Sequence, residues 1–257
     1  MKNSTRDVPT AYKNGYVEFY KLRFKVTPDV LIPRPETELL VDEVIRFLAD
    51  HPERSGESRR VEGSQIILDV GTGAGNIAIS LAKNLSHLGG VTIVATDISQ
   101  KALKVAQQNA KLHGVEDKIT FIQSDLLNVI PTQIASSSSS PRYDTKVDII
   151  VTNLPYIPTE RIDYLDTSVK DFEPKVALDG GEDGFELYRN LFAQIKQKGW
   201  HPKLIVCEID YTHAEIAIRE AQKLVVSEVE PFFPEAEVEV KLDLAKKQRI
   251  LLIRQFL

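Results

Sequence analysis

The chain has two parts that differ in the pattern of their hydrophobic and polar residues. In the later part of residues 16–26, apolar and charged side chains alternate along the chain, which predicts a short β-hairpin. Pro33 and Pro35 exclude a regular helix in the stretch that follows the hairpin. Apolar residues at helical spacing then predict a helix that begins after Thr37, whose hydroxyl is suited to cap it.

From residue 66 onward, the pattern becomes an alternation of strands and helices. Residues 66–70 form a continuous apolar run, which is typical of a strand buried on both faces of a sheet. The other predicted elements are strands at 91–96, 119–123, 147–152 and 204–208 and helices at 77–84, 101–113, 185–198 and 213–224. Two final strands, at 238–242 and 250–254, have no helix between them.

This alternation predicts an α/β fold with a doubly wound, Rossmann-like sheet of seven mostly parallel strands. The final pair predicts an antiparallel C-terminal edge strand, and the hairpin precedes the sheet. We divide the chain into an N-terminal segment with the hairpin (1–38) and a main domain (39–257).

Composition narrows the classes of protein and the kinds of site. The 257 residues are 42% hydrophobic and carry a net charge of −5, so the chain lacks the basic surface expected of a protein that grips duplex nucleic acid. The single cysteine, Cys207, excludes an intramolecular disulfide and a cysteine metal cluster, and its apolar neighbours indicate a buried thiol. The sequence has no apolar run of membrane-spanning length and no signal-peptide pattern, so we expect a cytoplasmic protein.

A glycine-rich turn, Asp69-Val70-Gly71-Thr72-Gly73-Ala74-Gly75, joins the first predicted sheet strand to a helix. Glycines let the backbone turn sharply and approach a ligand closely. The spacing departs from that of dinucleotide-binding loops, because Asn76 stands three residues after Gly73. The carboxylate of Asp69 would repel a pyrophosphate but attract the ammonium group of S-adenosylmethionine. An ordinary strand–helix turn is the alternative.

Two acidic residues strengthen the prediction of a nucleoside site. Asp97 ends the next predicted strand, 22 residues after Gly75, where a carboxylate can bind both ribose hydroxyls. Asp125 ends the third strand beside Leu126, and the two are suited to the edge and the face of an adenine ring. The alternative for Asp125 is a helix cap.

The fourth predicted strand runs directly into Asn153-Leu154-Pro155-Tyr156. An amide or exocyclic amino nitrogen is a poor nucleophile because its lone pair is delocalised. The side-chain oxygen of Asn153 and the backbone carbonyl of Leu154 can accept its two hydrogens and aim the lone pair at an electrophile. Pro155 stiffens the turn, and Tyr156 offers an aromatic face for stacking. Such positioning can supply most of the rate of a methyl transfer, so we nominate no general base. An Asn–Pro turn without a function is the alternative.

These residues resemble the HemK-like peptide-chain-release-factor glutamine methyltransferases from about residue 16 to the C-terminus. The tetrad at 153–156 is shared with other amino-methylating enzymes. More specific are the elements Pro33-Arg34-Pro35-Glu36-Thr37-Glu38 and Glu173-Pro174 through Gly180-Gly181-Glu182-Asp183-Gly184. The resemblance implies methylation of the glutamine in a Gly-Gly-Gln segment of a release factor, with S-adenosyl-L-homocysteine as the product.

The resemblance also implies roles for individual residues. The loop at 71–75 would bind the methionine part of the cofactor, Asp97 the ribose, and Asp125 with Leu126 the adenine. Asn153 would contact both the methyl donor and the glutamine amide. The segment containing Pro35 and Glu36 would line the substrate site, unless Arg34 and Glu36 only pair to fix their loop.

This chain departs from the family pattern at two points. Leu154 stands where the tetrad usually has a proline, which puts rate and substrate fit in doubt because the turn loses rigidity. The family carries a helical domain before the hairpin, for which about fifteen residues remain in this sequence. That departure implies either a trimmed chain or a naturally short member.

Other functions stay open at this point. The same tetrad fits a nucleic-acid amino-methyltransferase, although the acidic charge disfavours it. A non-catalytic cofactor-binding partner subunit is a second alternative, which the intact Asn153 and Tyr156 disfavour. The glycine spacing disfavours a nicotinamide oxidoreductase. We expect a monomer with a release factor as its substrate, no stable nucleic-acid partner and no metal.

Overall fold

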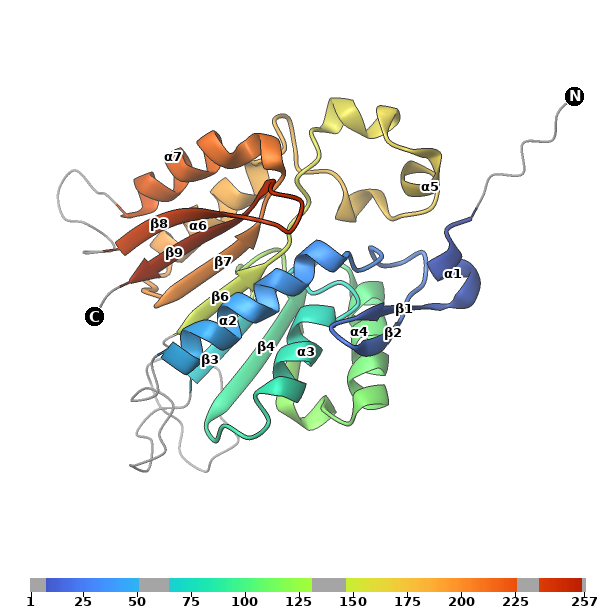
Figure 1. Cartoon of the computed structure of the whole chain (residues 1–257), viewed down its shortest axis with the longest axis horizontal. Coiled ribbons are helices and arrows are strands. Elements are labelled where there is room, and N and C mark those ends of the chain that lie inside the picture. Colours follow the sequence, from blue (N-terminus) through green and yellow to red (C-terminus); the bar gives the residue numbers. More distant parts are fainter. Residues whose placement is uncertain (1–7, 51–64, 131–146, 226–235, 256–257) are drawn as a thin grey trace, which may run out of the picture.

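A computed structural model describes residues 8–50, 65–130, 147–225 and 236–255. Its centre is a seven-stranded sheet with the order β5-β4-β3-β6-β7-β9-β8, covered by helices on both faces (Figure 1). The strands are β3 (Gln65–Val70), β4 (Val91–Asp97), β5 (Ile119–Gln123), β6 (Ile149–Thr152), β7 (Leu204–Glu208), β8 (Ala236–Leu242) and β9 (Gln248–Gln255). Five neighbouring strands, from β5 through β7, are parallel.

The predicted fold class is confirmed, and the structure refines its C-terminal end. Strand β9 pairs antiparallel with β7 on one side and with β8 on the other. The antiparallel strand therefore lies one position inside the sheet, and β8 forms the edge. Each predicted sheet strand is present, with ends that differ from the prediction by at most two residues.

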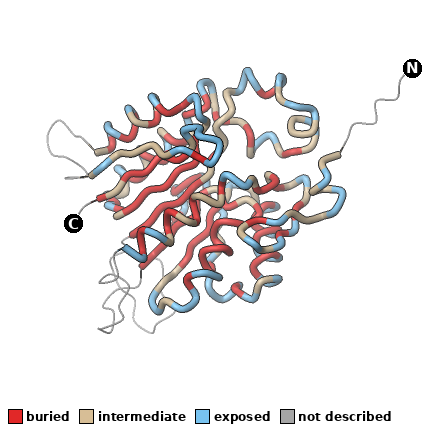
Figure 2. Tube along the Cα trace, in the orientation of Figure 1, coloured by how far each residue is buried: buried red, intermediate tan, exposed pale blue. Residues whose placement is uncertain are grey.

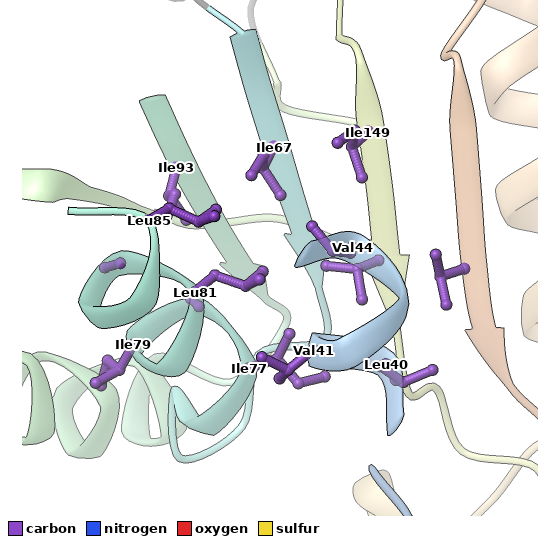
Figure 3. Packing of buried hydrophobic residues seen from close by; sticks show 14 of the residues in the cluster. Leu40, Val41, Val44, Ile67, Ile77, Ile79, Leu81, Leu85, Ile93 and Ile149 are labelled. Carbon is purple, nitrogen blue, oxygen red and sulfur yellow. The ribbon is translucent and has the colours of Figure 1, made fainter. Parts of the chain in front are cut away.

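The helices form two layers, one on each face of the sheet. They are α2 (Glu38–Asp50), α3 (Asn76–Asn84), α4 (Gln100–His113), α6 (Glu186–Gln197) and α7 (Ala214–Val225). Side chains of α2 and α3 pack on Ile67, Ile93 and Ile149 of the central strands (Figure 3). The alternate residues Ile66 and Leu68 of β3 point to the other face, where α6 and α7 cover them. A strand covered on both faces explains the continuous apolar run in the sequence.

Burial is concentrated in the middle of this sandwich (Figure 2). All six residues of β3 are buried, and Ile67 and Leu68 have no exposed surface. Each fully buried aliphatic side chain of this size stabilises the fold by about 1.5–3 kcal/mol. The central strands are therefore a firm base for the loops that follow their carboxyl ends.

The predicted N-terminal hairpin is present as β1 (Tyr16–Phe19) and β2 (Leu22–Lys25), preceded by the short helix α1 (Thr10–Asn14). Its two turn residues, Tyr20 and Lys21, have positive φ angles of 50° and 59°, as a tight two-residue hairpin turn requires. The turn is held because the backbone N–H of Tyr20 donates to the carboxylate of Glu38 at 2.7 Å.

One buried side chain joins the hairpin to the glycine-rich loop. Asn109 lies on the inner face of α4 and has no exposed surface. Its Oδ1 accepts a hydrogen bond from the backbone N–H of Lys25 at 2.8 Å, and its Nδ2 donates to the carbonyl of Lys25 at 3.0 Å. The same Nδ2 donates to the carbonyl of Ala74 at 2.8 Å. The hairpin and the loop are therefore fixed to one helix at one point.

The chain between β6 and α6 forms a separate lobe, drawn in yellow at the top of Figure 1. It contains α5 (Thr167–Lys170) and the 3-10 helices η4 (Thr159–Tyr164) and η5 (Lys175–Ala177). A parallel bridge between Ile157 and Asp179 closes the lobe at its base. This closure returns the chain to the end of β6, where the tetrad begins.

Candidate functional site

A cavity of about 600 Å³ lies at the carboxyl ends of the parallel strands. The loop after β3, the ends of β4 and β5, and the tetrad after β6 all contribute to its wall. The lobe closes it with Pro174 and residues of η5, and the N-terminal segment contributes Pro33 and Arg34. Ligands of doubly wound sheets bind at this edge, so the cavity is the candidate site.

The three glycines of the loop serve different purposes. Gly71, Gly73 and Gly75 all have positive φ angles, of 74°, 55° and 82°. A side chain on Gly75 would lie 2.9 Å from Ile79 and 3.1 Å from Ala106, so this glycine lets α3 approach α4. Gly73 has open space around it. It lines the cavity together with Gly71, Thr72 and Ala74. The structure thus brings all predicted loop residues together, with Gly75 behind the wall.

Asp69 lies behind the loop instead of facing the cavity. Its side chain has no exposed surface, and its Oδ2 accepts hydrogen bonds from the hydroxyl of Thr72 at 2.6 Å and the N–H of Ala78 at 3.2 Å. Burial raises the pKa of Asp69 to about 7, although these two hydrogen bonds lower it. Its Oδ1 is buried without a hydrogen-bond partner. Asp69 therefore holds the loop against α3, and a direct contact with an ammonium group stays a prediction.

Asp97 lies at the end of β4 and faces the cavity. Its Oδ2 accepts from the N–H of Gly73 at 2.9 Å, and its Oδ1 accepts from the N–H of Ser99 at 2.8 Å. Burial raises its pKa, against the effect of these bonds. A carboxylate offers about four acceptor positions, so Asp97 keeps capacity for further donors.

Asp125 and Leu126 lie beside Asp97 on the cavity wall. Asp125 is exposed, whereas Leu126 is buried with a positive φ of 50°. The chain makes a turn here, in which the N–H of Asn128 donates to the carbonyl of Asp125 at 3.1 Å. Because a turn follows in place of a helix, the alternative role of Asp125 as a helix cap is wrong.

Asn153 directly follows the carboxyl end of β6 and lines the cavity. Its Nδ2 donates to the hydroxyl of Thr37 at 3.1 Å, and that hydroxyl donates to Oε2 of Glu208 at 2.6 Å. The hydroxyl of Thr37 is thus bonded to side chains of the site, which differs from its predicted role as the cap of α2. Sequence reasoning missed Glu208, although its position at the carboxyl end of a predicted strand was a usable signal.

The remaining tetrad residues occupy different environments. Leu154 is buried, and its carbonyl accepts from the hydroxyl of Tyr188 at 3.1 Å. The same hydroxyl lies against the carbonyl of Glu208. Pro155 lines the cavity. Tyr156 is not among the lining residues; its hydroxyl lies 3.5 Å from Oε1 of Glu208, and burial raises its pKa well above the ordinary value.

The proline-rich segment reaches the site with residues other than those predicted. Pro35 and Glu36 are exposed and lie outside the cavity wall, which instead contains Pro33, Arg34 and Thr37. The structure does not place Pro35 and Glu36 in that wall, and their role in binding the protein substrate stays a prediction. They sit in the first turn of a short 3-10 helix, η1 (Pro35–Thr37), that turns them toward solvent.

Arg34 pairs with Glu173 of the lobe, and not with Glu36 as in the alternative considered for these two residues. Glu173 is buried and also accepts from the N–H of Ile32 at 3.2 Å. The two sequence elements on which the family resemblance mainly rests are thus bound directly to each other at the rim of the cavity. A distant ion pair of this kind has no local signal in the sequence.

The glycines of the second element permit a close approach to the tetrad. A side chain on Gly180 would lie 2.7 Å from the carbonyl oxygen of Pro155 and 2.8 Å from the Cα of Tyr156. At Gly184, where φ is 76°, it would lie 2.4 Å from the carbonyl oxygen of Tyr156. These contacts explain why glycines stand there, because the lobe returns directly onto the tetrad.

The described ranges of the chain lack two other features, a membrane-spanning helix and a metal site. No helix there is long and apolar enough to cross a membrane. Within the same ranges, no cluster of at least three His, Cys, Asp or Glu side chains could hold a metal ion. Cys207 is buried, and burial raises its pKa well above the ordinary value.

Solved structures with this fold include methyltransferases of low sequence similarity. The N-terminal domain of human METTL16 in complex with SAH has a TM-score of 0.54 and 15% identity, covering 92% of this chain and 77% of that chain. The hMettl16 catalytic domain in complex with MAT2A 3′UTR hairpin 6 has a TM-score of 0.64 and 14% identity, covering 93% of this chain and 77% of that one. At these identities, the similarity shows the fold alone.

Sequence relatives are much closer. Residues 62–228 match the family described as methyltransferase domain. The release factor glutamine methyltransferase of Bacillus cereus is 36% identical over 246 residues, which are 95% of this chain and 75% of the relative. That of Moorella thermoacetica is 42% identical over 183 residues, which are 71% of this chain and 55% of the relative. On this similarity, the chain belongs to the release factor glutamine methyltransferase family.

Proposed function

We propose that this protein transfers a methyl group from S-adenosylmethionine to the side-chain amide nitrogen of the glutamine in the Gly-Gly-Gln segment of a peptide chain release factor. The observation that carries the proposal is the position of Asn153. It shares one cavity with the glycine-rich loop and with Asp97, at the carboxyl ends of neighbouring parallel strands. The names of the relatives support the same reaction.

The donor half of the cavity fits S-adenosylmethionine in shape and in charge. The open backbone at Gly73 leaves room for the methionine part, which only a residue without a side chain offers. Asp97 has acceptor capacity for ribose hydroxyls, and Asp125 with Leu126 supplies a polar edge and an apolar face for adenine. S-adenosylmethionine supplies an electrophilic methyl group on a sulfonium when it is bound.

The acceptor half fits a primary amide. Asn153 donates through Nδ2 to Thr37, which leaves its Oδ1 to accept one hydrogen of the glutamine amide. The carbonyl of Leu154 has two lone pairs, of which the Tyr188 hydroxyl uses one, so the other is available for the second hydrogen. Two acceptors in these positions hold the amide plane and aim the nitrogen at the methyl group.

Positioning of this kind is the main contribution that we assign to the protein. A well-oriented pair of reactants gains about 10⁵–10⁸ M in effective concentration, which exceeds the effect of a typical general base. Water can take the proton that the methylated nitrogen loses. No residue of the site is therefore given the role of a base.

We assign the binding of the protein substrate to the N-terminal segment and the lobe together. The domain 39–257 contributes most of the cavity wall, and the segment 1–38 contributes Asp29, Val30, Leu31, Pro33, Arg34 and Thr37. The ion pair of Arg34 with Glu173 joins these parts at the rim. We propose that the protein works as a monomer, because one chain supplies both halves of the cavity.

The proposal is tested with labelled S-adenosylmethionine and three acceptors. These are a release factor, the same factor with the glutamine of its Gly-Gly-Gln segment replaced by alanine, and a mixture of tRNA and DNA. We expect label in the first acceptor alone. Equal labelling of the wild-type and alanine factors would exclude this glutamine as the acceptor. Label in the nucleic acids alone would identify a nucleic-acid amino-methyltransferase instead.

A further inference from the structure

A chain of hydrogen bonds runs from the interior of the protein to Asn153. Its inner end is Glu208, which is 2% exposed and lies at the carboxyl end of β7. Oε2 of Glu208 accepts from the hydroxyl of Thr37 at 2.6 Å, and that hydroxyl accepts from Nδ2 of Asn153 at 3.1 Å. The three residues come from η1, β7 and the end of β6, so the fold brings them together from distant parts of the chain.

The direction of these hydrogen bonds follows from the chemistry of the groups. An ionised carboxylate only accepts, so Thr37 must donate its single hydrogen to Glu208. The hydroxyl oxygen of Thr37 then has only acceptor positions left, and its neighbour must be a donor. Asn153 meets this requirement only with Nδ2 toward Thr37, which turns Oδ1 toward the cavity. The carboxylate therefore decides which end of the Asn153 amide the substrate meets.

We propose that Thr37 and Glu208 are positioning residues that fix the orientation of the Asn153 amide and thereby select an acceptor that presents an N–H group. The inference rests on the proposed function, since it concerns the same acceptor site. An Oδ1 that faces the cavity accepts from the NH₂ of a glutamine side chain. It repels the carboxylate of a glutamate. The hydrogen-bonded series Glu208–Thr37–Asn153, called the relay below, therefore makes the site specific for an amide over the corresponding acid.

The protonation state of Glu208 controls the relay. The groups that face it are Thr37, Tyr156 and Arg249, with Glu36 acting at longer range. Burial and Glu36 raise its pKa to about 7, although Thr37, Arg249 and Tyr156 lower it. Once protonated, Glu208 can donate to Thr37, whose hydrogen is then free to bond Oδ1 of Asn153. Asn153 would then present Nδ2 to the substrate, and two donors would face each other.

The first test compares variants of Thr37 with saturating S-adenosylmethionine and a release factor. Thr37→Val keeps the shape but removes the hydroxyl, and we expect kcat to fall by about 10–100-fold because the amide loses its orientation. Thr37→Ser restores the hydroxyl and should recover kcat to within about threefold of the wild type. The dissociation constant of S-adenosylmethionine should change by less than about threefold in both variants. Equal kcat values in the valine and serine variants would contradict the proposal.

Thr152→Val is the matched control for a lost buried hydroxyl. Thr152 is fully buried and donates to the carbonyl of Val70 at 2.7 Å, one residue before Asn153. This variant should keep the pH dependence described next. If the control lost that dependence, the effect would belong to packing around β6 and the relay would be refuted.

The second test is the dependence of kcat on pH. In the wild type, kcat should fall as the pH decreases through about 7, because Glu208 becomes protonated. Glu208→Gln can still accept from Thr37 but cannot titrate, so its kcat should lose this decrease. Asp69 also has a pKa of about 7, but it holds the cofactor loop and should affect affinity more than kcat. An unchanged pH profile in Glu208→Gln would overturn the proposal.

A third measurement separates the relay from the proposed reaction. The side-chain NH₂ signal of Asn153 in a ¹⁵N NMR spectrum, assigned by its absence in Asn153→Ala, reports the hydrogen bond to Thr37 without any turnover. We expect this signal to shift with the titration of Glu208 in the wild type and to be insensitive to pH in Thr37→Val. A shift without release-factor methylation would retain the relay and reject the function. A signal that ignores pH in the wild type would reject the relay.

Discussion

The glycine-rich loop and the tetrad occupy equivalent positions but are held in different ways. They follow β3 and β6, which are neighbouring parallel strands with Val70 beside Thr152. The loop is shaped by the positive φ angles of its glycines and by Asp69, which bonds residues three and nine positions away. The tetrad is held by side chains that lie far from it in the sequence, above all Thr37 and Tyr188.

The two halves of the site have different structural requirements. Binding a donor molecule requires a backbone that approaches closely, which a short run of small residues can provide by itself. Aiming a substrate amide requires polar groups in fixed directions, which need support from several elements. Variants in the two halves should therefore affect different measured quantities.

The largest effect is expected for Asn153→Ala. The variant removes an acceptor that no neighbour replaces, so kcat should fall by about 10³-fold or more. The dissociation constant of S-adenosylmethionine should stay within about fivefold of the wild-type value, because the loop keeps its own conformation. Single-turnover kinetics and calorimetry measure the two quantities.

Asn84→Ala is the control for Asn153→Ala. It removes the same group from the end of α3, where Nδ2 of Asn84 donates to the carbonyl of Ser80 at 2.8 Å. Turnover should be unaffected there. If Asn153→Ala weakened cofactor binding as strongly as it slowed turnover, the division between the two halves would not hold.

An intermediate effect is expected for Asp97→Ala, on cofactor affinity. Asp97 holds Gly73 through its N–H and has acceptor capacity left for the ribose. Losing a charged hydrogen-bonding group should weaken binding of S-adenosylmethionine by about 10–100-fold. In Asp97→Asn, which keeps one acceptor oxygen, the loss should be smaller. Calorimetric titration checks the order of the three proteins; equal affinities would remove the ribose role.

The smallest effect on turnover is expected for Tyr188→Phe. The hydroxyl of Tyr188 is fully buried against the carbonyls of Leu154 and Glu208, so its loss removes the one hydrogen that these two buried acceptors share. The free energy of unfolding should decrease by about 1–3 kcal/mol, and kcat should fall only a few-fold, roughly as expected for one neutral hydrogen bond. Chemical denaturation and steady-state kinetics give both values.

Tyr20→Phe is the matched control for this change. It removes a half-buried hydroxyl that donates to Asp42 at 2.7 Å, far from the tetrad. It should cost less stability and leave kcat unchanged. An equal loss of kcat in Tyr20→Phe would show that Tyr188 has no special relation to Leu154.

The fold could be predicted from the sequence because its signals are local. The apolar run of β3 and the periodic apolar positions of α4 each follow from neighbours along the chain. The ends of α4 likewise depend on nearby residues, since Ser99 accepts from the N–H of Ala102 and Gly114 ends the helix with a φ of 63°. The order of β8 and β9 in the sheet was not readable, because a strand pair joined by a turn can add to an edge in either order.

The site could be predicted only in part for the same reason. The loop at 71–75 and Asn153 were identified because each follows a predicted strand. The exposure of Pro35 and Glu36 depends on how η1 packs, and Arg34 finds its partner Glu173 at a separation of 139 residues. Position 154 lacks the proline of the family pattern. Its carbonyl instead accepts a hydrogen bond from the hydroxyl of Tyr188, which lies 34 residues away.

The side chain of Asn109 has a consequence for motion. All three of its hydrogen bonds go to backbone atoms of Lys25 and Ala74, so hairpin and loop can separate from α4 only by breaking a shared anchor. Local unfolding of one should therefore accompany local unfolding of the other. Hydrogen exchange at the amide of Lys25, remote in sequence from any ligand contact, should slow when S-adenosylmethionine binds. Hydrogen exchange in the N-terminal hairpin would then report whether S-adenosylmethionine is bound at the glycine-rich loop.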